Sequence, residues 1–256
     1  MIILDWRNEI KPQLIETGYH NKDLKKSTQR IIEGGSWKRQ RVIMLIPAGP
    51  TIPTKVYLSH CGLIFPPNQP AHRMAAIGME VGEAFSNSIQ EIINHPDLKD
   101  WEYILTIEHD NLVQCDTLVK LIHHMEKHPE FSNIGGLYYT KGEGGVPQIW
   151  GDVNDPIPNY RPQPPIPPDE WAKRGSLKEC YGTGMGCNLW RISMFKDERL
   201  RKPWFKTVAD YTGVGTQDLY FASDARKYGY RFAIACDVPV GHYDFEGKFG
   251  PPDMVW

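Results

Sequence analysis

Four side chains that can bind metal or move protons stand where strands or helices of this sequence are expected to begin or end. Glu108 and Asp110 directly follow an apolar run. Asp218 stands at the start of a predicted helix, and His242 follows the last apolar segment. Carboxylate oxygens suit Mg²⁺ and Mn²⁺, which hold diphosphates, and neutral imidazole binds divalent transition metals. These residue types therefore fit metal-assisted chemistry on a phosphate-bearing ligand.

Each of these residues also has an ordinary structural explanation. The acidic residues at 108 and 110 could cap the next helix or solvate a loop. Asp218 could cap its own helix, because the helix dipole favours a carboxylate there. A lone histidine in a loop, such as His242, is more often structural or exposed than a ligand. Taken one at a time, the residues leave both explanations open.

The surrounding pattern predicts an α/β sheet that would bring these residues to one edge. Strands are expected at four apolar runs, 41–47, 101–107, 133–139 and 231–236, and a further β-like segment near 55–65. Helical periodicity is found over three segments, 74–94, 115–128 and 217–228. Such alternation favours a mostly parallel central sheet flanked by helices, whose ligands bind beyond the carboxyl ends of its strands.

The chain is expected to form a single domain preceded by a helical extension. Amphipathic patterning over 8–33 predicts one or two helices, so we place an N-terminal helical extension at 1–40 and one domain at 41–256. Residues 140–171 are rich in proline and glycine. A loop of this length is typical of an active-site wall or lid, although a passive surface insertion has the same composition.

Composition disfavours several classes of protein. The 256 residues are 41% hydrophobic and 23% charged, as in ordinary globular proteins. A formal net charge of −2 makes nucleic acid or an anionic membrane an unfavoured partner. Five cysteines without a C-x-x-C pair argue against a disulfide scaffold or a thiolate zinc site. No apolar run approaches the ~20 residues that span a bilayer, so we expect a cytoplasmic protein without a transmembrane segment.

The order of these features resembles that of nucleotide-sugar glycosyltransferases of the GT-A type, close to family 2 and its phage and bacterial relatives. The resemblance covers residues 41–244. It rests on the first strand ending at Pro47, segment 104–110, the glycine-rich segment 182–187, Gln217-Asp218 and Gly241-His242. It implies a GT-A (Rossmann-like) fold, a UDP- or GDP-sugar donor, a glycan or other hydroxyl acceptor, and Mn²⁺ or Mg²⁺ as cofactor.

The resemblance also implies individual roles. Asp110 and His242 would bind the metal directly. Glu108 would contact the donor ribose, or the metal through water, and glutamate at this position departs from the usual pattern. Asp218 corresponds to the general base of inverting members, and in a retaining enzyme it would instead orient the sugar or the acceptor. The donor would contact four residues, Pro47, Ala48, Glu108 and Gly184.

Aromatic residues in the late loops fit a carbohydrate site, because such rings stack on sugar faces. Trp204 lies outside any periodic segment and is the preferred acceptor-binding candidate, together with Tyr181, whereas Trp190 is expected in the core. A modified DNA base is a conceivable acceptor that the charge balance disfavours. The spacing of His123, His124 and His128 predicts that they do not share one helical face, which argues against a metal cluster there.

Two other functions compete with glycosyl transfer. A nucleotidyltransferase would also use an α/β sheet and a metal, but it needs a basic phosphate loop after the first strand, and residues 47–51 contain no Lys or Arg. A non-catalytic carbohydrate- or nucleotide-binding module is the third possibility. For such a module, Asp218→Asn would leave all measurable behaviour unchanged.

Overall fold

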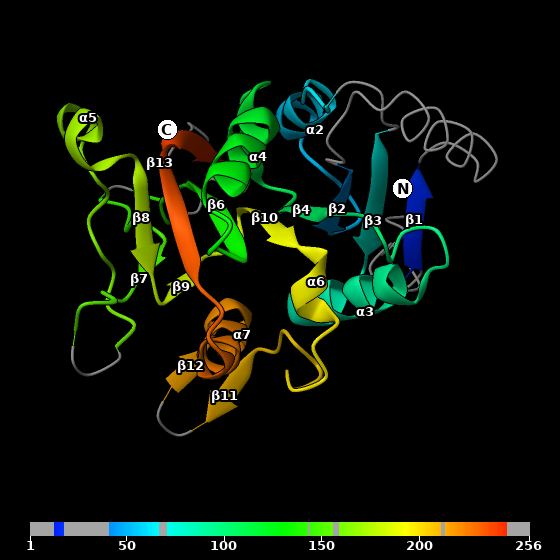
Figure 1. Ribbon diagram of the computed structural model, residues 1–256. Coiled ribbons are helices and arrows are strands. Elements are labelled where there is room, and N and C mark those ends of the chain that lie inside the picture. The colour runs from blue at the N-terminus through cyan, green and yellow to red at the C-terminus, as the bar shows by residue number, and fades with distance from the viewer. Residues whose placement is uncertain are drawn as a thin grey trace, which may run out of the picture.

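A nine-stranded sheet forms the centre of the computed structural model, which describes residues 13–17, 41–66, 71–142, 144–155, 159–210 and 213–244 (Figure 1). Eight strands follow one another in the order β1 (Gln13–Thr17), β3 (His72–Ile77), β2 (Val42–Ala48), β4 (Tyr103–Ile107), β10 (Cys187–Arg191), β6 (Asn133–Leu137), β13 (Phe232–His242) and β5 (Asn111–Val113). The ninth, β8 (Leu177–Cys180), pairs with β13.

Five central strands of this sheet point in one direction. β2 is parallel to both β3 and β4, and β6 is parallel to β13. β10 runs antiparallel to its two neighbours, β4 and β6, so those two share a direction. The carboxyl ends of β3, β2, β4, β6 and β13 therefore lie at one edge of the sheet. The predicted α/β fold with a mostly parallel central sheet flanked by helices is confirmed.

Helices cover both faces of the sheet, and alternating residues of β2 show the two sides. Ile43 and Leu45 belong to a cluster with α3 (Val81–Asn94), α6 (Ile192–Phe195) and α7 (Gln217–Ala225). Val42 and Met44 belong to a cluster with α4 (Thr117–Lys127), which lies on the opposite face together with α2 (Thr54–Cys61) (Figure 1). This alternation is expected for a strand buried on both faces.

Two predicted elements of the main domain need correction. Residues 54–61 form a helix, α2, rather than a strand: Val56 and His60 are buried, whereas Leu58, which would share their face in a strand, is 62% exposed. The predicted helix over 74–94 begins only at Val81. Residues 72–77 form β3, whose burial alternates with a period of two, and Gly78 at φ 74° separates strand from helix.

The N-terminal extension contains a strand where helix was predicted. β1 pairs antiparallel with β3, with Gln13 opposite Ile77 and Thr17 opposite Arg73. The prediction of helix is therefore wrong for residues 13–17, and the rest of 1–40 lies outside the described residues.

The remaining elements are short. Two small antiparallel pairs are formed by β7 (Ile149–Trp150) with β9 (Gly182–Thr183) and by β11 (Val208–Asp210) with β12 (Gly213–Gly215). Three helical turns are η2 (Pro168–Glu170), α5 (Trp171–Arg174) and η3 (Arg226–Tyr228). Within the described ranges, no helix combines the length and apolar character needed to cross a bilayer.

The glycine-rich segment before β10 is shaped by close packing against Tyr138. A Cβ on Gly184 would collide with the Tyr138 hydroxyl and lie 2.9 Å from the Cβ of Gln148. We expect Gly184→Ala to lower the free energy of unfolding by ~1–3 kcal/mol, the usual cost of overpacking. Gly49→Ala is the matched control, since nothing lies within 4 Å of a Cβ placed there. Urea denaturation of both variants measures the difference, and equal stability would contradict this packing.

Candidate active site at the carboxyl edge of the sheet

The turn after β4 is attached to two segments that are distant in sequence. The Glu108 amide donates to the Gly186 carbonyl (3.1 Å), just before β10, and the Tyr243 amide donates to the Asp110 carbonyl (2.7 Å), just after β13. These backbone hydrogen bonds bring residues 108–110 beside the ends of β10 and β13. Backbone hydrogen bonds alone therefore place the predicted acidic pair, Glu108 and Asp110, at the ends of these strands.

Asp110 lies between a lysine and a histidine. Lys141 Nζ is 2.6 Å from Asp110 Oδ2, and His242 Nε2 is 3.5 Å from the same oxygen. His242 Nδ1 lies 2.8 Å from the Tyr139 carbonyl, which can only accept, so Nδ1 donates. Nε2 is then the unprotonated nitrogen of the neutral ring, where it can bind a metal, and it donates to Asp110 when the ring is protonated.

The charge state of Asp110 is set by opposing effects. Burial alone would raise the pKa of this carboxyl, but hydrogen bonds and positive charge from His242 and Lys141 overcome burial and hold the pKa well below its ordinary range. Asp110 is therefore an ionised carboxylate at neutral pH.

Glu108 and Asp218 complete the cluster of carboxylates. Burial, followed by the negative charges of Asp110 and then Asp218, raises the pKa of Glu108 to about 8. Asp218, at the start of α7, is 8% exposed and accepts hydrogen bonds from the Thr216 hydroxyl and from the Leu219 amide at 2.8 Å. Burial outweighs these bonds and raises its pKa as well. The structure thus brings residues 108, 110, 218 and 242 together.

Tyr138 is the central residue of this site that sequence reasoning missed. It directly follows β6, its hydroxyl accepts a hydrogen bond from the Gly186 amide at 3.0 Å, and its ring meets His242 edge-on at 5.6 Å. Burial, then the charges of Glu108 and Asp218, raises its pKa well above 10. A neutral phenol therefore faces the carboxylates. Its place at the carboxyl end of a central strand was the signal, as it also was for Lys141.

A cavity of about 400 Å³ opens beside the acidic pair. Its lining comes from the ends of β2, β3 and β4 and comprises Pro47, Ala48, Gly49, Gly78, Met79, Val81, Glu108, His109 and Asp110. Three of the predicted donor-binding residues, Pro47, Ala48 and Glu108, thus lie in one cavity. Its volume is in the range of small-molecule sites.

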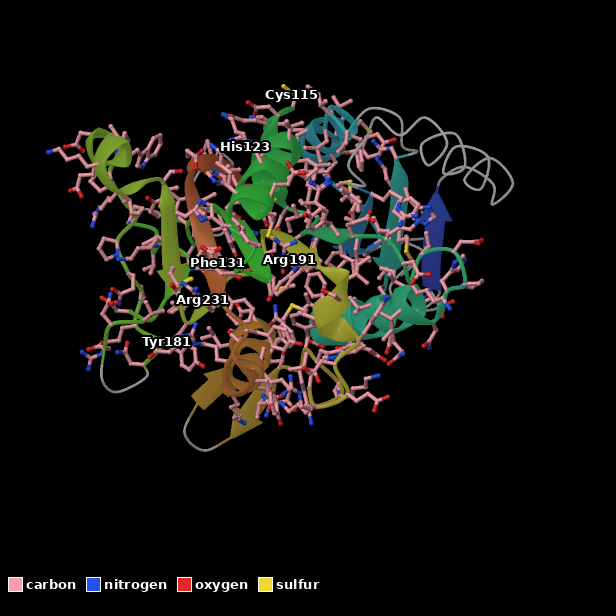
Figure 2. The ribbon with its side chains drawn as sticks, viewed as in Figure 1. Cys115, His123, Phe131, Tyr181, Arg191 and Arg231 are labelled. Carbon is pink, nitrogen blue, oxygen red and sulfur yellow. The ribbon has the colours of Figure 1, made fainter. Side chains whose placement is uncertain are left out.

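The structure places the other predicted binding residues elsewhere. Trp204 is 1% exposed and packs edge-on against Phe195 at 5.6 Å, so it is a core residue and the prediction of an acceptor contact is wrong. Gly184 faces Tyr138 rather than the cavity, which does not support its predicted donor contact. Tyr181 lies at the lower left of Figure 2. Its ring centre is 4.2 Å from the Arg226 guanidinium.

The donor atoms at Asp110 and His242 fit a divalent cation. A carboxylate oxygen and an imidazole nitrogen with a suitably directed lone pair lie 3.5 Å apart, and a carbonyl holds the far side of the ring. In the described part of the chain, no group of three or more His, Cys, Asp or Glu could hold a metal ion. A cation here would therefore take its remaining ligands from bound substrate oxygens or water.

The raised pKa of Glu108 predicts a pH-dependent cost in stability. In the unfolded chain this group ionises near 4.5, whereas in the folded protein it stays protonated to about pH 8. Across that window the folded state binds the extra proton, so stability falls as pH rises. Glu108→Gln removes the titration, so its melting temperature relative to wild type should be higher at pH 9 than at pH 5 in EDTA. The exposed Glu91→Gln is the control, and an equal difference at both pH values would argue against the shift.

Comparisons with known proteins identify a shared fold. No protein-family model and no curated protein sequence matches the chain. Among solved structures, A197 from STIV has a TM-score of 0.55 and 14% identity, covering 80% of this chain and 87% of A197. Two structures of S. aureus TarS 1–349 also match, each at 11% identity over 78% of this chain. The TM-score is 0.46 for the structure in complex with UDP-GlcNAc and 0.43 for the other. The match spans 57% and 59% of the TarS chains. At this level of identity, the likeness to A197 establishes that the chain has the same kind of α/β fold.

Proposed function

We propose that this protein transfers a sugar from a nucleoside-diphosphate sugar to a hydroxyl acceptor with the help of Mn²⁺ or Mg²⁺. The observation that carries the proposal is the meeting of Glu108, Asp110, Asp218 and His242 beside a cavity of suitable size at the carboxyl edge of the sheet. Ligands of open α/β sheets bind at this edge.

The donor end of the proposed reaction lies at the cavity between β2 and β4. The nucleoside would occupy the space lined by Pro47, Ala48 and Glu108, which places the diphosphate near Asp110. Asp110 and His242 would hold the cation, which when bound neutralises charge on the departing diphosphate. Lys141 adds a second positive charge next to Asp110.

The acceptor end of the proposed reaction lies at Asp218. Its ionised carboxylate would take the proton from the acceptor hydroxyl while that oxygen bonds to the sugar carbon and the bond to the diphosphate breaks. Thr216 and the Leu219 amide fix the carboxylate, and burial raises its pKa toward the working range of a base. A base opposite the leaving group inverts the configuration at the sugar carbon.

A panel of ligands tests this proposal against nucleotidyl transfer. Thermal unfolding would be recorded with UDP- and GDP-sugars, among them UDP-GlcNAc, and with nucleoside triphosphates, each with Mn²⁺ or with EDTA. We expect one nucleotide sugar to raise the melting temperature in Mn²⁺ but not in EDTA, because a ligand stabilises the state it binds. Stabilisation by triphosphates alone would favour a nucleotidyltransferase. Stabilisation by no nucleotide at all would contradict the proposal.

A further inference from the structure

Lys141 contacts Asp110 at the atom that a divalent cation would use. Its Nζ lies 2.6 Å from Asp110 Oδ2, and His242 Nε2 lies 3.5 Å from the same oxygen. The side chains of Lys141 and Asp110 are only 19% and 14% exposed, so solvent screens their contact only in part. One carboxylate oxygen is therefore shared by an ammonium and by the imidazole that is proposed to bind the metal.

The Lys141 ammonium and a divalent cation on this oxygen would repel each other. Divalent cations such as Mg²⁺ bind carboxylate oxygens at about 2.1 Å, so a cation on Asp110 Oδ2 would lie within about 5 Å of Lys141 Nζ. Like charges at this distance repel, and more strongly in a half-buried site than in water. A cation that binds Asp110 must therefore displace the ammonium from it.

The backbone that carries Lys141 is fixed, whereas its side chain can move. The preceding residue, Thr140, is joined to Val146 by two hydrogen bonds. The Thr140 amide donates to the Val146 carbonyl at 2.9 Å, and the Val146 amide donates to the Thr140 hydroxyl at 2.8 Å. The ammonium itself is carried by a flexible stem of four carbon atoms. It can therefore leave Asp110 while the backbone stays in place.

We propose that Lys141 occupies the cation-binding oxygen of Asp110 until a divalent cation displaces it. The inference rests on the proposed function, in which Asp110 and His242 bind that cation. Lys141 neutralises the carboxylate in the metal-free protein and thereby lowers the affinity for the cation alone. The diphosphate of the donor attracts the displaced ammonium, so donor and cation should bind more tightly together than either does alone.

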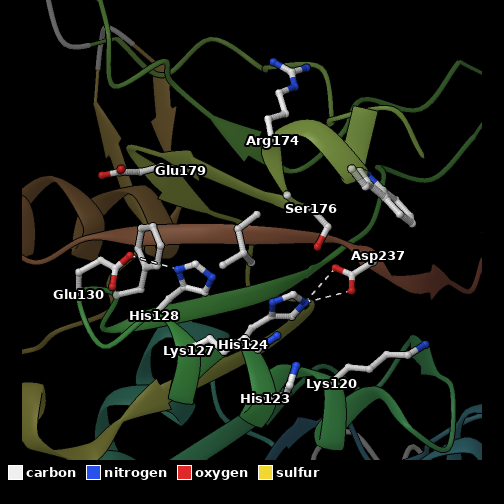
Figure 3. A pocket seen from close by; sticks show the side chains of 14 residues that line it. Lys120, His123, His124, Lys127, His128, Glu130, Arg174, Ser176, Glu179 and Asp237 are labelled. Atoms are coloured by element: carbon white, nitrogen blue, oxygen red, sulfur yellow. Dashed lines mark hydrogen bonds and ion pairs between the residues drawn. The ribbon is translucent and has the colours of Figure 1, made fainter. Parts of the chain in front are cut away.

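A second carboxylate–imidazole pair provides an internal comparison. His124 Nε2 lies 3.0 Å from both oxygens of Asp237, in a cavity of about 590 Å³ between α4 and the start of β8 (Figure 3). His123 and His128 line this cavity too, so the prediction that the three histidines do not share one face is corrected. Because His124 already engages both oxygens of Asp237, we expect Mn²⁺ to bind at Asp110 and not at this pair.

Binding of Mn²⁺ without nucleotide, followed by electron paramagnetic resonance of the free ion, tests the inference. We expect Lys141→Met to bind Mn²⁺ at least fivefold more tightly than the wild type. Lys141→Arg keeps a positive charge on Asp110 and should bind Mn²⁺ as weakly as the wild type does.

Thermal unfolding of Lys141→Met supplies a second measurement. In EDTA this variant should melt several degrees below the wild type, because a half-buried carboxylate has lost its ammonium. Saturating Mn²⁺ should remove most of that difference, because the bound cation replaces the lost charge. A difference that Mn²⁺ leaves unchanged would mean that the cation does not take the place of Lys141, and it would overturn the inference.

Three controls locate the effect. Lys99→Met removes an exposed lysine that lines neither cavity, and Asp237→Asn alters the second pair. Both should bind Mn²⁺ as the wild type does, whereas Asp110→Ala should abolish binding.

The outcomes separate this inference from the proposed function. If Asp110→Ala abolishes binding but Lys141→Met binds no more tightly than the wild type, the inference fails and the metal role of Asp110 stands. An equal gain in Lys99→Met would also overturn the inference, because it would show a general effect of charge. Binding by none of these proteins, or binding that depends on Asp237 instead of Asp110, would contradict the proposed metal site and the inference with it.

Discussion

Asp218→Asn is expected to lower the rate of sugar transfer by roughly 10²–10⁴-fold while donor affinity stays close to that of the wild type. An amide cannot take the proton that the acceptor hydroxyl must lose. It can still accept from the Leu219 amide through its side-chain oxygen, so the start of α7 should persist. Single-turnover rates and donor titrations measure the two quantities separately.

The control for this variant is Asp224→Asn, the same substitution at a buried position of the same helix. Asp224 accepts from the Arg201 amide at 2.9 Å and takes no part in the acidic cluster, so its loss should cost stability rather than chemistry. In the wild type, turnover should also fall as pH drops through the raised pKa of Asp218, because only the ionised carboxylate is a base. Unchanged turnover in Asp218→Asn would remove this residue from the role of base.

Asp110→Ala is expected to abolish the gain in donor affinity that a divalent cation provides, which should be tenfold or more in the wild type. The variant removes the ionised carboxylate next to His242 Nε2, leaving the cation without its strongest protein ligand. Calorimetric titration of the donor in Mn²⁺ and in EDTA measures the gain. Asp100→Ala, at a side chain 70% exposed, is the control and should keep it. Equal wild-type affinity in Mn²⁺ and EDTA would count against any metal role.

The sheet and the position of the candidate site at its carboxyl edge were predictable from the sequence, because apolar strands followed by charged residues form a clear pattern. The runs ending at Pro47 and Ile107 are buried on both faces, and ligand-binding residues follow strands at the carboxyl edge. The local pattern of apolar residues did not reveal β3. Its buried and exposed residues alternate over only six positions, and this short alternation runs into the helical periodicity of α3. The pattern also failed for α2, where the apolar residues Tyr57 and Leu58 are exposed to solvent instead of buried in a sheet.

The errors at the site have a different cause, since they depend on how irregular segments fold back. Trp204 lies in a loop, but the Phe205 amide donates to the Ser86 hydroxyl of α3 at 3.0 Å, and this attachment carries the indole into the core. Tyrosine is common in strands, so the residue type alone did not indicate that Tyr138 lies beside the carboxylates. Lys141 reaches Asp110 through a turn in which Gly142 and Gly144 have positive φ.

The most direct test is a crystal structure of the protein grown with Mn²⁺ and UDP or GDP, with anomalous data collected for manganese. The account predicts one manganese peak in direct contact with the Asp110 carboxylate, His242 Nε2 and the diphosphate, with the nucleoside in the cavity beside Pro47 and Glu108. Manganese bound elsewhere, or a nucleotide seated away from this edge of the sheet, would contradict it.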